Sequence, residues 1–411
     1  MQHTQLKIGD WIRWIAIYLL LLFSSGYYFR DNMGTRALAI MTASALALMA
    51  TYGIKKEQNT KKLIMLFSGM MIWTVFCSFL AHDDTKKTLI FLIGYIVALI
   101  IAISVKPFDY MQIFLKVTRL LIVFSLIANI LEIVNIHVYQ ILPHAVINKG
   151  HFLLLTTIRD YGSQVRNSSI FWEPGAYQTI LVISYLFELM TRSKHNELYR
   201  WLIIVSIFTT LSTTGIICAL ILIVCQVIEK EDQLIRNNHV KRLIIIAIII
   251  MIVIFVGMHF FSDRVEYLLS RNITTKFHFF FSDSTQDASS SVRRDSIRYP
   301  LLKFISNPIT GVGASGLNSI SEIVGHTMLT CTWINWFAKS GLLYGLFMTI
   351  GLWKLTTLGF QTKSVRILMF ITIIVSISSE NYIDNPIIIV LSLYGFAMPH
   401  QIKNKEIIKH E

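Results

Sequence analysis

Long apolar runs, divided by short polar segments, make up most of the chain. The run LIIIAIIIMIVIF at 243–255 lacks the alternation of apolar and polar residues that a strand of a membrane barrel needs. Runs of about 20 apolar residues cross a bilayer as helices, which satisfy their own backbone hydrogen bonds. We therefore expect an all-α, polytopic transmembrane helical bundle. The helices are expected at 11–29, 37–54, 63–81, 88–105, 113–134, 172–190, 201–228, 243–261, 328–352, 366–379 and 385–398.

The run 201–228 can be interpreted in two ways. It is interrupted by Ser212-Thr213-Thr214-Gly215, and a break there would give two short helices. If the run crosses twice, five segments marked by lysine and arginine lie in the cytoplasm, as the positive-inside rule requires: 55–62, 192–200, 230–242, 354–366 and 403–409. The alternative is one long tilted helix, which would invert every later loop. The broken pair predicts about twelve crossings, with both termini in the cytoplasm.

With this topology the chain is a single integral membrane domain over 1–411, and its larger loops are external. These are the first external loop, 135–171, and the second external loop, 262–327. They hold much of the polar chemistry of the chain.

Composition supports a membrane protein. Hydrophobic residues are 54% of the chain and charged residues 15%, against about 25% charged in soluble domains. The net charge of +13 lies largely in short loops between apolar runs, where it sets topology and faces anionic headgroups. We therefore expect the lipid bilayer, and no nucleic acid, as a partner. The four cysteines lie in or beside apolar runs and are interpreted as packing residues without a disulfide or metal role.

The first external loop ends in RNSSIFWEPGAYQ, which contains Arg166 and Glu173. Pro174 suits the first turn of a helix, so Glu173 is expected at the mouth of that helix. An acid there is favoured by the helix dipole alone, which is the structural interpretation. A carboxylate close to the membrane is also costly without a partner or a function, which is the functional interpretation.

The second external loop contains SVRRDSIRYP and then NPITGVG. Arg294 and Arg298 are four residues apart, so in a helix they share a face, with Arg293 adjacent. Two guanidinium groups on one face can grip a diphosphate, although a solvated face or contact with lipid headgroups is also possible. NPITGVG is predicted to be a turn, in which Gly311 and Gly313 allow close approach of the backbone to another group, such as phosphate.

Several further charged residues are candidates. His326 lies just before the next apolar run, where it could take a proton from a hydroxyl group. Glu380 and Asp384 lie in the last external turn and are secondary candidates. No DxD, Walker or GxGxxG motif is present, so we expect no metal and no cofactor. Most of the charges within predicted helices lie near the ends and are expected to reach the interface: Lys116, Arg119, Glu132 and Glu188, with Lys339 deeper.

Three features resemble the O-antigen and capsular polysaccharide polymerase family, the Wzy type, which is related to the O-antigen ligases. The first is FWEPGAYQ opening a central helix, with Arg166 just upstream. The second is the STTG break within a long apolar run. The third is the order RRDSIR, NPITGVG, a histidine, and an apolar helix containing SGLLYG over 291–345.

The resemblance implies a metal-independent membrane glycosyltransferase of the GT-C type at the outer face of the bacterial plasma membrane. Its substrates would be oligosaccharide repeat units on undecaprenyl diphosphate, joined into O-antigen, capsular polysaccharide or exopolysaccharide. Arg294 and Arg298, with Arg166, would stabilise the diphosphate, and His326, or alternatively Glu173, would act as the base. A chain-length regulator is a further candidate partner. The alternatives are an O-antigen ligase and, in another class, a flippase, although a transporter should show two matching halves.

Overall fold

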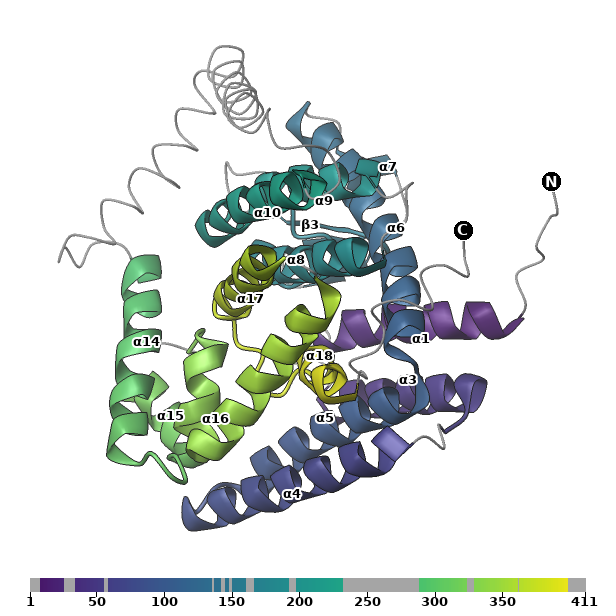
Figure 1. Ribbon diagram of the computed structural model, residues 1–411. Coiled ribbons are helices and arrows are strands. Elements are labelled where there is room, and N and C mark those ends of the chain that lie inside the picture. The colour runs from purple at the N-terminus through teal and green to yellow at the C-terminus, as the bar shows by residue number, and fades with distance from the viewer. Residues whose placement is uncertain are drawn as a thin grey trace.

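The computed structural model describes residues 8–25, 34–54, 58–134, 137–141, 145–147, 150–159, 166–191, 197–231, 288–323, 329–360 and 362–397. These residues form a helical bundle, which confirms the predicted all-α membrane architecture (Figure 1). The predicted helix 243–261 lies outside the described residues.

Five helices of the N-terminal part match the first five predicted apolar runs. They are α1 (Ile8–Ser24), α3 (Thr35–Tyr52), α4 (Gln58–Leu80), α5 (Thr85–Ser104) and α6 (Pro107–Ile133). The last of them begins earlier than the predicted residue 113. Its first residue is Pro107, whose fixed φ suits a first turn and whose missing N–H costs nothing there.

Among the described residues, five helices are long and apolar enough to span a membrane: Thr35–Tyr52, Thr60–Leu80, Thr85–Ser104, Pro107–Ile133 and Thr332–Gly359. Shorter apolar helices lie at Thr213–Ile228 and Pro386–Ala397. The outer face of α4 exposes Met65, Ile72 and Phe79, each at least 70% accessible. Because these residues are seven apart, they form one stripe along the helix, as expected of a surface that faces lipid.

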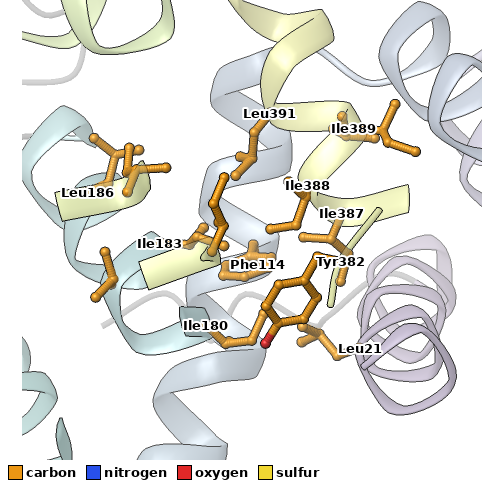
Figure 2. Packing of buried hydrophobic residues seen from close by; sticks show 14 of the residues in the cluster. Leu21, Phe114, Ile180, Ile183, Leu186, Tyr382, Ile387, Ile388, Ile389 and Leu391 are labelled. Atoms are coloured by element: carbon orange, nitrogen blue, oxygen red, sulfur yellow. The ribbon is translucent and has the colours of Figure 1, made fainter. Parts of the chain in front are cut away.

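Helix α8 (Pro174–Thr191) lies at the centre of the bundle, and its residues from Pro174 to Leu189 are buried. It packs against α6, against α9 (Glu197–Thr209) and α10 (Thr213–Glu231), and against α17 (Lys363–Ile377). Figure 2 shows its side chains Ile180 and Ile183 in one apolar cluster with Phe114 of α6 and Ile387 of α18 (Pro386–Ala397). The central position explains why α8 is buried on all sides, with its polar residues Gln178 and Glu188 buried as well.

The predicted break within 201–228 is confirmed. Helix α9 ends at Thr209, Leu211 has a φ of 50°, and α10 begins at Thr213. A Cβ built on Gly215 would lie 3.2 Å from Ile207 Cγ2, whereas residues eight apart in one straight helix are separated by about 12 Å. The chain therefore reverses at 210–212 and forms a helical hairpin. Two membrane crossings by this hairpin remain a prediction.

Both predicted external loops contain structure that the apolar pattern did not reveal. The first holds the short helix α7 (Val138–Ile141) and an antiparallel sheet in the order β1 (Ala145–Ile147), β2 (Gly150–Phe152) and β3 (Thr157–Arg159). The second holds α14 (Ala288–Ser306) and α15 (Gly313–Ile323). These elements are too short or too polar to produce an apolar run of membrane length.

Helix α16 (Thr332–Gly359) is interrupted at Ser340 and Gly341, where the sequence had indicated one continuous helix. In an unbroken helix the Leu342 N–H would bond to the Ala338 carbonyl. Instead, Leu342 donates to the Pro308 carbonyl at 2.8 Å, and the Ala338 carbonyl accepts from Val312 at 2.8 Å. The turn over 307–312 thus replaces the hydrogen bonds lost at the break, as apolar surroundings require.

Gly341→Ala is expected to reduce the yield and melting temperature of the folded protein. Gly341 has a φ of 76° and a ψ of −173°, a region that costs a residue with a Cβ about 1–3 kcal/mol, and its Cβ would also collide with the Ile309 carbonyl. Thermal unfolding in detergent measures the effect. Gly69→Ala within α4 is the matched control, because a Cβ there meets nothing within 4 Å. Equal stability of Gly341→Ala and the wild type would contradict the described break.

Candidate functional site

The candidate site surrounds the N-terminus of the central helix α8. Glu173 immediately precedes the helix, and its carbonyl accepts bonds from Ala176 and Tyr177 at 3.1 Å. The Glu173 side chain is exposed, whereas Pro174 and Gly175 are buried. The sequence prediction that Glu173 lies at the mouth of a helix is therefore confirmed, while its catalytic role remains a prediction.

Glu380 reaches the same helix terminus from the turn between α17 and α18. Its side chain is 4% exposed, and Oε1 lies where a Cβ of Gly175 would be. The Glu380 carbonyl accepts a bond from the Thr332 hydroxyl at 2.6 Å, and the same hydroxyl accepts from the Tyr382 N–H at 2.7 Å. Glu380 is thus held between α8 and the start of α16, and residue 175 must be glycine to make room for it.

Arg166 lies beside the turn of the α9–α10 hairpin. Its Nε donates to the Thr210 carbonyl at 3.1 Å and its Nη2 to the Leu211 carbonyl at 3.4 Å. The neighbouring Asn167 N–H donates to the Thr209 carbonyl at 3.0 Å. These bonds join the end of the first predicted external loop to the STTG break, two features that the sequence had given separately.

A small pocket of about 40 Å³ lies beside Arg166. Polar side chains contribute much of its wall, among them Asn129, Glu132, Thr157 and Asn167. A space of this size accommodates one or a few water molecules or a single polar group of a ligand.

Arg293 lies on a partly buried face of α14, whereas Arg294 and Arg298 lie on a different, exposed face. Arg293 is half-buried, and its charge acts on Glu380. Pro300, seven residues later on the same face, is buried as well. Arg294 and Arg298 are exposed, with Arg294 Nε 4.0 Å from Asp295 Oδ1. The predicted shared face of Arg294 and Arg298 is confirmed, but their binding of diphosphate is untested.

Four ionisable groups from three distant segments therefore converge: Arg166, Glu173, Arg293 and Glu380. Burial raises the pKa of Glu380 well above its ordinary value, and the nearby Glu173 raises this pKa further. The positive charges of Arg293 and Arg166 lower the same pKa by a smaller amount. The arrangement combines cations, which can stabilise a leaving anion, with carboxyl groups, which can exchange a proton.

The predicted glycine turn approaches other parts of the protein closely. Gly311 and Gly313 have φ values of 71° and 70°. Gly311 lies against the Ala338 and Lys339 backbone, and Gly313 lies against Asp83 from the α4–α5 turn. Asp83 accepts bonds from the Ala314 and Ser315 N–H groups at 2.8 and 2.7 Å, so this helix N-terminus already holds a carboxylate. A phosphate role for the two glycines remains a prediction.

His326 and Lys339 are two further charged or ionisable residues that the sequence singled out. His326 lies outside the described residues, so its role as a base remains a prediction. Lys339, which the sequence left without a structural role, is 5% exposed and places Nζ 3.4 Å from the ring centre of Phe91. This cation–π contact gives the buried lysine a favourable environment.

Asp83 and Glu380 are two site residues that the sequence pattern indicates poorly. Asp83 stands in a short polar turn, HDD, between two apolar runs, and such turns commonly contain polar residues without a site. Glu380 in ENYIDNP had a weak signal, because an acid two residues before Tyr382 in the last turn is equally consistent with a solvated loop. Only the fold reveals that this turn folds inwards against α8.

Residues 198–343 match the family described as O-antigen ligase. The match includes the α9–α10 hairpin, the arginines of α14, the glycine turn and the first part of α16, and it covers a little over a third of the chain. No curated protein matches the chain.

Proposed function

We propose that the chain is a membrane glycosyltransferase that polymerises lipid-linked oligosaccharides. The proposal is supported by the match of residues 198–343 to the O-antigen ligase family, within a helical membrane protein. Its substrates are repeat units carried on undecaprenyl diphosphate, and its product is O-antigen, capsular polysaccharide or exopolysaccharide. The reaction takes place at the outer face of the bacterial plasma membrane, with both termini of the chain in the cytoplasm.

The convergence of Arg166 and Arg293 with Glu173 and Glu380 is the observation that supports this proposal most strongly. Each of these residues comes from a segment that the charge pattern assigns to the external side. A diphosphate leaving group develops negative charge, and guanidinium groups stabilise it in a bidentate manner without a proton transfer. Arg294 and Arg298, on the exposed face of α14, are further candidates for binding the diphosphate.

In the proposed reaction, a hydroxyl oxygen of the acceptor unit attacks the anomeric carbon of the growing chain. The bond from that carbon to the diphosphate oxygen breaks, and its electron pair leaves with undecaprenyl diphosphate. The hydroxyl proton passes to a base, for which His326 and Glu173 are the candidates. Arg166 and Arg293, together with Arg294 and Arg298, stabilise the departing diphosphate.

A second candidate function is ligation of finished polymer to a lipid A core. The description of the matching family as O-antigen ligase supports it directly. Both reactions release the same lipid diphosphate and differ only in the hydroxyl acceptor. The basic and acidic groups described above serve either reaction, so the acceptor decides between them.

Glycan profiles of cells with the gene deleted and then restored test the proposal. A polymerase predicts that deletion reduces the ladder to a single repeat unit on the final acceptor. A ligase predicts that polymer remains on the lipid carrier and none reaches the final acceptor. Failure of lipid-linked units to reach the outer face would indicate a flippase, and an unchanged ladder would overturn both enzymatic functions.

A further inference from the structure

Glu380 is a buried carboxyl group fixed in position beside an exposed one. Its Oε1 packs against Gly175, and its backbone carbonyl is held by Thr332 at 2.6 Å. Its Oε2 is buried and accepts no hydrogen bond from a donor group among the described residues. A side chain held in this way has little freedom to reach water, so its charge depends on its immediate neighbours.

Glu380 Oε1 lies against Gly175, only two residues after Glu173, and the two side chains interact as a hydrogen-bonding pair. Two ionised carboxylates offer only acceptors, so a hydrogen bond between them requires a proton on one. Glu380 is 4% exposed, whereas Glu173 is exposed, and burial disfavours the charged form. The proton therefore belongs to Glu380.

We infer that Glu380 is a neutral carboxylic acid that donates a hydrogen bond to the Glu173 carboxylate and thereby orients it as a proton acceptor. Glu380 is thus a positioning residue, and this role rests on the function proposed above. The donated bond holds Glu173 ionised and aimed towards the acceptor hydroxyl group. A carboxylate without this donor would hold a proton at higher pH and would be free to rotate.

The groups that face Glu380 shift its pKa in opposite directions. Glu173 before α8 and the burial by α8 and α16 favour the protonated form. Arg293 of α14 and Arg166 beside the α9–α10 turn favour the ionised form, because their positive charges attract a carboxylate. Tyr382 follows on the same turn and donates a hydrogen bond from its hydroxyl group to the Ala176 carbonyl at 3.3 Å. Burial and Glu173 together outweigh the two arginines, since the pKa of Glu380 is raised well above its ordinary value.

The protonation state can be measured without any reaction. Infrared spectra of the purified chain in lipid nanodiscs at neutral pH should contain the C=O stretch of a protonated carboxyl group. Glu380→Gln should remove this band, whereas Glu322→Gln, an exposed glutamate on α15, should leave it unchanged. Retention of the band in Glu380→Gln, or its absence from the wild type, would overturn the inference.

Thermal stability provides a second measurement that needs no substrate. A carboxyl group with a raised folded pKa contributes stability that is complete at acidic pH and is lost as the pH rises towards that pKa. The wild type should therefore lose stability with rising pH more steeply than Glu380→Gln, which carries no titrating proton. Parallel curves for the two proteins would contradict a protonated Glu380.

The pH profile of polymer formation tests the positioning role. Glu380→Gln keeps a neutral donor and should retain more activity than Glu380→Ala, with the acidic limb near that of the wild type. Glu380→Ala should move the acidic limb to higher pH, because Glu173 loses its donor. An equal loss of rate at every pH would reduce Glu380 to a structural role. Absence of polymer from the wild type would overturn the proposed function instead, while the infrared result would stand.

Discussion

Arg293→Ala is expected to remove long polymer while the protein remains in the membrane. The guanidinium of Arg293 acts on Glu380 from a half-buried position, whereas Arg294, the next residue, is exposed. In the proposed reaction Arg293 binds the departing diphosphate, and loss of one partner of such a desolvated charged hydrogen bond costs about 2–5 kcal/mol, where about 1.4 kcal/mol is a factor of ten. The rate of polymer formation should therefore fall by about 30-fold or more.

The glycan ladder measures this effect, with an immunoblot of the membrane fraction to show that each variant is present. Arg293→Lys keeps the charge but loses the planar fork, so it should restore only part of the polymer. Arg166→Ala should have a similar effect, although it also removes two bonds to the hairpin turn. If Arg294→Ala and Arg298→Ala abolish polymer while Arg293→Ala does not, the diphosphate binds to the exposed face of α14. Normal polymer from Arg294→Ala and Arg298→Ala would remove those two residues from the site.

Arg119→Ala is expected to be the most destabilising single change among the ion pairs of the bundle core. Arg119 of α6 donates from Nε and Nη2 to the two carboxylate oxygens of Glu188 at 2.7 and 2.9 Å. Glu188 is fully buried, so the sequence expectation that it reaches the interface is wrong. Removal of Arg119 leaves a buried carboxylate unpaired, which costs about 3–5 kcal/mol.

Thermal unfolding in detergent compares Arg119→Ala with Lys116→Ala, an exposed lysine on the same helix whose loss should change stability by about 0.5 kcal/mol or less. The double variant Arg119→Leu/Glu188→Leu should recover most of the loss, because it leaves no buried charge. Equal melting temperatures for Arg119→Ala and Lys116→Ala would show that the pair does not stabilise the bundle.

The helices could be predicted from the sequence because a helix needs an apolar run of about 20 residues to cross the hydrocarbon core of a bilayer. Even the hairpin could be predicted, since Ser212-Thr213-Thr214-Gly215 and the positive-inside rule indicate the same break. The break at Ser340 and Gly341 was not, because one glycine within an apolar run occurs in continuous helices too. Its cause lies in the turn over 307–312, about 30 residues away, which supplies the missing hydrogen bonds.

The candidate site was predictable only in part. Arg166, Glu173 and the arginines of α14 could be identified from the sequence because a charge close to a membrane is costly unless it has a partner or a function. Which of three neighbouring arginines points inwards depends on the packing face of α14, and the sequence gives no partner for that face. Glu380 requires the last turn to fold against Gly175, a contact between residues that are about 200 apart in the chain.

The proposed polymerase activity is tested most directly with the purified chain in lipid nanodiscs and lipid-linked repeat units extracted from the deletion strain. The proposed polymerase should produce a ladder of lipid-linked glycans and release one undecaprenyl diphosphate for each new glycosidic bond. Formation of no ladder from these units, under conditions in which the chain remains folded, would contradict it.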